Sequence, residues 1–224
     1  MNRGALKLRA GRVCGISLGT SSDEADDVAL LEELANEAIL DVLRRTRVHV
    51  RSGNVDIDSS GEFDVDQSIL HIWGIDRGGQ RLLLQDKDEL DQDGYAFTGF
   101  NRIILGSPGA SGDQTLMLWY TPRPTPMDSD DDDPSSEAFG LIPPEFHRAL
   151  VNYMCWWASD KAGDPQTQRG EKYRIRYEGP DANGGPGSDL GQIKAAVTRR
   201  ADSVRIVRAK AVLASDVEPQ YWTG

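Results

Sequence analysis

The hydrophobic period of the sequence changes twice, and this change constrains the fold more than any other feature. Residues 24–46 repeat apolar side chains at helical spacing, in a stripe made of Leu31, Leu34, Ala35, Ala38 and Val42. Residues 48–122 instead hold short apolar runs separated by Gly or Asp clusters, which is typical of antiparallel strands joined by turns. The helical period returns over residues 143–162. The sequence therefore predicts an α+β fold.

The two helical parts are expected to pack together. The helix over residues 24–46 begins with acidic residues and ends among three arginines, an order that suits the helix dipole. A Pro-Pro pair suits the start of the helix near residue 143. Further helices are expected over residues 2–16, 165–178 and 189–202. We therefore expect a helical bundle from residues 1–47 and 143–203, with an antiparallel β module over residues 48–122 inserted into it.

Within the β module, the apolar runs predict where strands lie. Val48, Val50, Val55 and Ile57 alternate with polar residues. Further strands are expected over residues 69–75, 81–85, 101–106 and 114–121. Residues 86–90 are expected to form one helical turn inside the module.

An acidic segment separates the β module from the later helices. Residues 123–142 contain several prolines and a run of aspartates over residues 128–133, so we expect a flexible loop that packs no core. Carboxylates also suit a Ca²⁺ ion, but the run lacks the spaced ligands and the glycine of an EF-hand loop. Contiguous like charges are more typical of a solvated segment.

The charge balance limits the classes of partner. The chain has 36 acidic against 25 basic residues, a net charge of −11, which disfavours gripping nucleic acid but permits a surface that DNA slides past. No apolar run approaches the ~20 residues of a membrane span, and residues 6–17 lack the apolar stretch of a signal peptide. We expect a soluble protein that is made in the cytoplasm, with Cys14 and Cys155 as free thiols.

Patterns that predict an enzyme are missing from the sequence. His49, His71 and His147 have no second His or Cys at metal-ligand spacing, and we interpret them as packed or surface side chains. There is no Gly-x-Ser-x-Gly elbow, no phosphate-binding loop and no dinucleotide fingerprint. We therefore expect no catalytic residues, no cofactor and no metal ion.

Aromatic side chains indicate two places for contacts. In the pair Trp156-Trp157, helical geometry points the rings about 100° apart, so one is expected in the core and one at an interface. The C-terminal residues 204–224 are expected to form an extended tail that docks on a partner. Its proposed anchors are Val204, Ile206, Val212, Leu213, Tyr221 and Trp222.

The order of these segments resembles head-to-tail adaptor (connector, or head-completion) proteins of tailed bacteriophages. Residues 31–46 (LEELANEAILDVLRRT) look like the early bundle helix of that family, and residues 142–153 (IPPEFHRALVNY) look like its proline-started helix. Between them, the β module contributes FDVDQSILHIW, RIILGSP and LMLWYTPRP. The likeness covers roughly residues 25–205 and rests on the order and spacing of these stretches.

The resemblance implies a structural virion protein of the neck, at the junction of capsid and tail. Such a protein forms a homo-oligomeric ring, commonly of twelve copies, which binds the portal protein and then the next neck or tail protein, while DNA passes through its bore. The acidic run would then repeat around the axis, with Asp128, Asp130, Asp131, Asp132 and Asp133 as candidate lumen residues. Two alternatives remain: a carbohydrate- or host-binding β module, and an accessory metal-dependent hydrolase.

Overall fold

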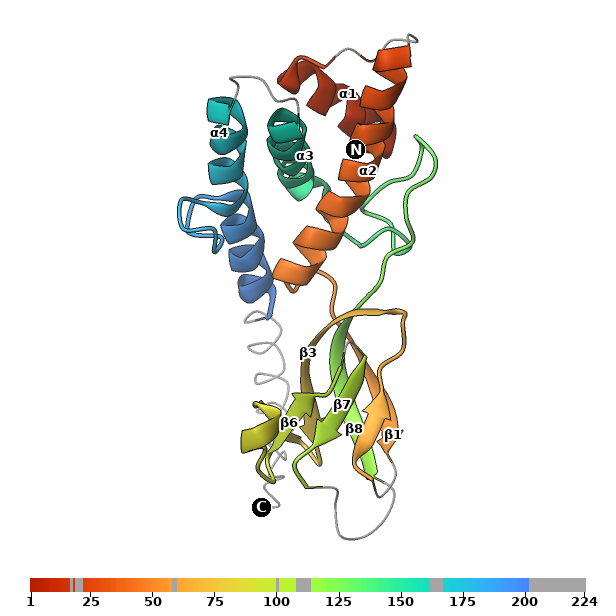
Figure 1. Cartoon of the computed structure of the whole chain (residues 1–224), viewed down its shortest axis with the longest axis vertical. Helices are drawn as coiled ribbons and strands as arrows, with labels where there is room; N and C mark the ends of the chain where they lie inside the picture. Colours follow the sequence, from red (N-terminus) through yellow and green to blue (C-terminus); the bar gives the residue numbers. More distant parts are fainter. Residues whose placement is uncertain are drawn as a thin grey trace, which may run out of the picture.

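The computed structural model describes residues 1–16, 18, 22–57, 60–99, 101–107, 114–161 and 167–201. The molecule is elongated, with helices at one end and two small sheets at the other (Figure 1). The connections between the two ends run along residues 46–50 and 123–143, where the chain has no regular secondary structure. The α+β class predicted from the sequence is confirmed.

The helical end is organised around a central helix. The helices are α1 (Arg3–Cys14), α2 (Ser22–Arg45), the 3-10 turn η2 (Pro144–Phe146), α3 (His147–Lys161) and α4 (Thr167–Glu178). Residues 189–201 are also helical. Helix α3 packs against α1, α2 and α4, so helices from both ends of the chain meet in one layer of contacts.

The β end consists of two four-stranded sheets. The first has the strand order β1 (Arg51–Ile57), β8 (Gln114–Pro122), β3 (Ile69–Arg77) and β4 (Gln80–Arg81). The second has the order β2 (Glu62–Asp64), β7 (Arg102–Leu105), β6 (Gly94–Phe97) and β5 (Leu83–Leu84). The pairs are antiparallel except β5 with β6, which is parallel and corrects the expectation of a wholly antiparallel module. The 3-10 turn η1 (Lys87–Glu89) supplies the expected helical turn between those two strands.

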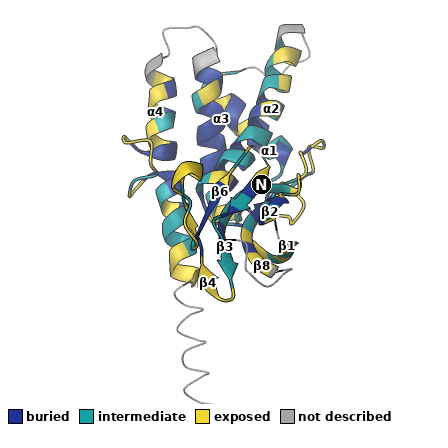
Figure 2. Cartoon of the chain, turned by 60° about the horizontal axis from the view of Figure 1, so that its bottom comes forward, coloured by how far each residue is buried: buried dark blue, intermediate teal, exposed yellow. Residues whose placement is uncertain are grey.

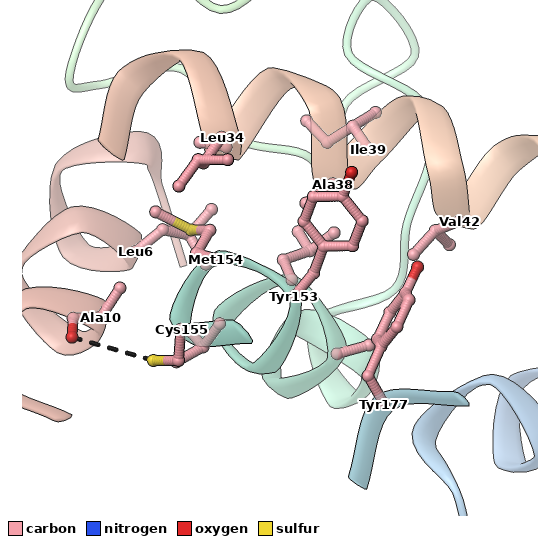
Figure 3. Close-up of a cluster of buried hydrophobic side chains, with 14 of the residues drawn as sticks. Leu6, Ala10, Leu34, Ala38, Ile39, Val42, Tyr153, Met154, Cys155 and Tyr177 are labelled. Atoms are coloured by element: carbon pink, nitrogen blue, oxygen red, sulfur yellow. Dashed lines mark hydrogen bonds between the residues drawn. The ribbon is translucent and has the colours of Figure 1, made fainter. Parts of the chain in front are cut away.

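The apolar stripe of α2 faces the centre of the helical end. Figure 3 shows Leu34, Ala38 and Val42 of α2 on the side that faces Tyr153 and Met154 of α3. The stripe residues have no exposed surface, and α1 adds Leu6 and Ala10 to the same cluster. In Figure 2 the buried surfaces of the helices face one another and the exposed ones point outward. The stripe therefore marks the packing side of α2, as its spacing predicts.

A hydrogen bond fixes α4 against α2 at the edge of this core. The hydroxyl of Tyr177 donates a 2.6 Å hydrogen bond to the Asp41 carboxylate. Glu178, next to it, accepts a 2.7 Å charged hydrogen bond from Arg45. Burial and the nearby Asp41 charge raise the pKa of Tyr177 well above its usual value, so the phenol stays a donor.

A second hydrophobic cluster lies between the two sheets. Ile75, Leu116 and Leu118 of the first sheet are buried together with Ile103 and Leu105 of the second. These residues lie on different strands, and strand alternation turns them toward the same interior. The β end therefore has its own core.

The segment 123–142 departs from the sequence expectation that it packs no core. Met127 and Ile142 are fully buried in the cluster of the helical end. The Met127 amide donates to Asn36 of α2 over 2.8 Å, and the Asn36 side chain donates back to the Met127 carbonyl over 3.3 Å. The expectation is wrong because two apolar residues flank the aspartates, and their burial holds the segment against the helices.

Candidate interaction surfaces

The six tail residues predicted as portal anchors (Val204, Ile206, Val212, Leu213, Tyr221 and Trp222) lie outside the described residues. The predicted lumen residues are described. They form a turn over residues 128–133, hereafter the acidic turn, which lies beside α1 and α2 on the side of the molecule away from α4 (Figure 1).

The acidic turn has internal hydrogen bonds. One oxygen of the Asp132 carboxylate accepts from the amides of Asp128 and Ser129, both over 2.8 Å. The Asp133 carboxylate accepts from the amide and the hydroxyl of Ser135 over 2.8 and 2.5 Å. The carboxylates of Asp132 and Asp133 therefore stabilise the backbone conformation of the acidic turn.

Two cations of α1 attach the acidic turn to the helical end. Arg3 donates to the carbonyls of Met127 and Asp128 over 2.8 and 2.7 Å. The Lys7 ammonium lies 2.6 Å from the Asp130 carboxylate and 2.7 Å from that of Glu32. The hydrogen bond from Lys7, together with the charges of Lys7 and Arg3, holds the pKa of Asp130 below its usual value. Of the five aspartates, Asp128 and Asp131 remain exposed with no ion-pair partner among the described residues.

A second surface lies at the waist of the molecule, where the helical end meets the sheets. Three adjoining hollows there share lining residues: His71 and Phe97 line two of them, and Arg47 and Trp73 again line two. We call these three hollows together the waist groove. Its walls come from the end of α2, from β3, from β5 and β6, and from the helix over residues 189–201.

The waist groove is basic in an acidic protein. Its described lining contains no carboxylate and six cations, namely Arg44, Arg45, Arg47, Arg81, Arg123 and Lys194. Arg45 pairs with Glu178 and Arg81 pairs with Asp76. The other four have no carboxylate within ion-pair distance in the described part of the chain. The groove therefore keeps uncompensated positive charge.

The floor of the groove is aromatic. The Arg47 guanidinium lies 5.1 Å from the centre of the Trp73 ring, and the His71 ring meets the same indole edge-on at 4.4 Å between centroids. The Trp73 indole donates a 2.7 Å hydrogen bond to the hydroxyl of Thr121. Arg81 donates to the Trp73 carbonyl over 2.7 Å. Burial lowers the pKa of His71, and the charges of Arg44 and Arg47 lower it further, so its ring is neutral at pH 7.

Apolar side chains stand exposed at the rim of the groove. Leu83 and Leu84 of the edge strand β5 are 60% and 61% exposed, and Phe97 of β6 is 43% exposed. Arginines and aromatic rings are typical of a protein-binding surface, and clustered exposed apolar side chains mark interaction sites.

A family model for the SU10 adaptor protein matches residues 1–212. The chain belongs to the SU10 adaptor protein family. No match was found among curated proteins. The family match confirms the resemblance to phage head-to-tail adaptors. The protein is a structural adaptor of a bacteriophage virion, which acts at the junction of head and tail and contacts other head and tail proteins.

Sequence reasoning missed the waist groove of this adaptor. From the sequence, the arginines at the end of α2 fit only the helix dipole, and Trp73 fits only a strand. The available signal was a cluster of basic residues in an acidic chain, next to a helix end. That signal gives no position for Arg81, Arg123 and Lys194, which come from other elements and reach the groove only through the fold.

Two of the histidines considered for catalysis or metal binding, His49 and His147, are buried. The Nε2–H of the His147 ring donates to the Ile142 carbonyl over 3.0 Å, and burial lowers the pKa of this histidine. Burial and Arg51 lower the pKa of His49. In the described residues, no group of three His, Cys, Asp or Glu side chains is arranged to hold a metal ion. No helix there is long and apolar enough to cross a membrane.

Trp156 and Trp157 differ in burial, but the expected divergence of their rings is wrong, because the two indoles lie 5.0 Å apart between centroids and are tilted by only 32°. Trp156 is half-buried against the helical core, whereas Trp157 is 37% exposed. The Trp157 ring is the more accessible one for a contact. The two cysteine side chains meet each other between α1 and α3 as free thiols.

Proposed function

We propose that this adaptor forms a ring under the portal, extends the DNA channel and joins the capsid to the tail. The observation that carries the proposal is the match to an adaptor family over residues 1–212. The protein reaches its site from the host cytoplasm, binds the portal on one side of the ring and the next neck or tail protein, a stopper or tail terminator, on the other.

The shape of the protomer supports a ring. A head-to-tail ring needs two different surfaces on opposite sides of each copy, because every contact pairs one with the other. The acidic turn and the helix over residues 189–201, which forms one wall of the waist groove, lie at opposite sides in Figure 1. Twelve copies is the ring size that the resemblance to head-to-tail adaptors implies.

The charge of the chain supports a passive channel. Each copy carries a net charge of −11, so a ring repels the phosphates of DNA and lets it slide without specific binding. The same charge makes copies repel one another in solution. We therefore expect the chain alone to be monomeric at moderate salt and to form a ring when the portal provides the template.

The test is to mix the purified full chain with purified portal and to examine the complex by negative-stain microscopy and mass photometry. The expected result is a ring of added density on one face of the portal. A chain that forms a stable dimer and shows no affinity for portal would contradict the proposal.

A deletion tests the role of the C-terminal tail. We propose that Val204, Ile206, Val212, Leu213, Tyr221 and Trp222 anchor the chain to the portal. Removal of residues 204–224 is expected to abolish portal binding while the helical circular dichroism signal stays the same. Normal docking of the shortened chain would refute the assignment.

A further inference from the structure

We infer that the waist groove is the receptor for the acidic turn of a neighbouring copy, so that these two surfaces form the contact between protomers. The inference rests on the proposed ring and names the residues that would close it. It assigns Asp128 and Asp131 to a contact between copies rather than to the bore.

The groove has the chemistry of a receptor for carboxylates. Arg44, Arg47, Arg123 and Lys194 lack a carboxylate partner among the described residues, although the chain has more acidic than basic residues. Arginines present planar donor groups that suit carboxylates. Arg47 is also held in place by the Trp73 ring, which lowers the entropy that it would lose on binding.

The apolar part of the groove favours a protein over DNA. Leu83, Leu84 and Phe97 expose apolar surface beside the arginines, and this surface gains nothing from a phosphate backbone. A polypeptide covers both the cations and the apolar rim. The Ile142 amide donates over 2.9 Å to the carbonyl of Pro134, which follows the acidic turn, and the adjoining Leu141 is 40% exposed, so an apolar side chain accompanies the carboxylates.

The acidic turn is built as a rigid ligand. A solvated loop that only repels DNA needs no fixed shape, yet Arg3, Lys7 and Asn36 all hold this turn through hydrogen bonds. Asp132 fixes its backbone from inside. The result is that Asp128 and Asp131 are presented in one geometry, and preorganised groups bind more tightly than mobile ones.

The acidic turn and the helix over residues 189–201 that walls the groove lie on opposite sides of one copy (Figure 1), so the contact is head-to-tail. The acidic turn of each copy then meets the groove of the next, and the pattern repeats until the ring closes. The contact pairs opposite charges and should therefore weaken as salt is added.

Reversed charges test the pairing on the full chain with portal. The single variants are Arg47→Glu, which places a negative charge in the groove, and Asp131→Arg, which places a positive charge on the turn. Each alone is expected to bind portal with its tail but to lose the cooperative filling of the ring, with the affinity between copies reduced about tenfold or more. Arg9→Glu is the control for Arg47→Glu, since it makes the same charge change on an exposed residue of α1.

The decisive sample is an equimolar mixture of the two single variants. In a head-to-tail ring that alternates them, the groove of the first meets the turn of the second with opposite charges, and the other contact is the normal one. The mixture, and also the double variant Arg47→Glu/Asp131→Arg, are therefore expected to regain cooperative filling. An adventitious stability effect of either substitution would not be repaired by mixing.

The outcomes separate this inference from the proposed function. If the unaltered chain does not bind portal at all, the proposed ring is wrong. If it fills the portal cooperatively and the single variants do so equally well, or if mixing restores nothing, the pairing of groove and turn is wrong while the ring stands. Binding of random-sequence duplex DNA that is lost in Arg47→Glu, measured by fluorescence anisotropy, would make the groove a nucleic-acid site and would also overturn the inference.

Discussion

The guanidinium of Arg47 lies 5.1 Å from the centre of the Trp73 ring, so a cation that follows α2 rests on an aromatic side chain of β3. An exposed cation–π contact contributes about 0.5–1 kcal/mol. Trp73 also donates a hydrogen bond to Thr121, which lies on β8. One indole therefore connects the helical end, the sheet and the floor of the waist groove.

Replacing Trp73 with Phe is expected to lower the free energy of unfolding by about 1–2 kcal/mol. The ring for Arg47 remains, but the fully buried Thr121 hydroxyl loses its donor. Trp119→Phe is the matched control, because the Trp119 indole donates over the same 2.7 Å to Asp76 at an exposed position where water can replace it. Urea titration of both variants gives the comparison. Equal losses in the two variants would contradict the role of burial.

Arg3→Met is expected to loosen the acidic turn. The methionine keeps an apolar stem but removes the donors to the carbonyls of Met127 and Asp128, at a cost of about 2 kcal/mol. Hydrogen exchange should then speed up at the amides of Asp128 and Ser129 while α3 stays protected. Arg9→Met on the exposed side of α1 serves as the control. Unchanged exchange in the turn would show that Arg3 does not hold it.

Stability is expected to fall as the pH drops below about 6.5, the ordinary pKa of histidine. Burial and Arg51 lower the pKa of His49 in the folded chain, and burial lowers the pKa of His147 and His71. Below the unfolded pKa, the unfolded chain therefore binds more protons, and this favours unfolding until the folded histidines also protonate.

His49→Leu should remove part of that pH dependence. Denaturant titrations at pH 7.5 and pH 5 measure it, both values being chosen to bracket the ordinary histidine pKa at about 6.5. The variant is expected to lose less stability between the two pH values than the unaltered chain. An equal loss in both proteins would exclude His49 as a contributor.

Mild oxidation is expected to join Cys14 to Cys155. The two thiols lie close enough to interact, which lowers the pKa of Cys14 and, with burial, raises that of Cys155, and the Cys155 thiol donates over 3.8 Å to the Ala10 carbonyl. Cys14 is the more exposed thiol, so it should lose its proton first. Diamide takes up the two hydrogens as the sulfur–sulfur bond forms.

The product is measured by mass spectrometry as a chain lighter by two hydrogens, and it should resist urea better because the crosslink ties α1 to α3. Cys14→Ser is the control that cannot form it. Crosslinked dimers on a non-reducing gel, or two free thiols after treatment, would contradict this expectation.

Much of the helical end could be predicted from the sequence. The stripe that includes Leu34 and Ala38 fixed the position and buried side of α2, because a helix repeats every 3.6 residues whatever it packs against. The β end was predicted less completely. Strands β2 and β6 are only three and four residues long, and such short runs carry too few alternations to stand out.

The segment 123–142 shows why composition alone misled. Six charged or polar neighbours outweigh Met127 in any local average, yet this one side chain is fully buried and brings the turn onto the helices. The partners that hold the turn, Arg3 and Asn36, lie far from it in the sequence. A pattern confined to a window of residues contains no information on such contacts.

The sequence by itself determined the α+β class, the helices and the adaptor family, because periodicity and the order of segments are local and linear properties. Only the tertiary structure decided the waist groove and the fixed acidic turn. The groove gathers Arg47, Arg123 and Lys194 from three separate parts of the chain, and the turn depends on cations of α1. Charges act through space, so their balance at a surface is set by the fold that brings them together.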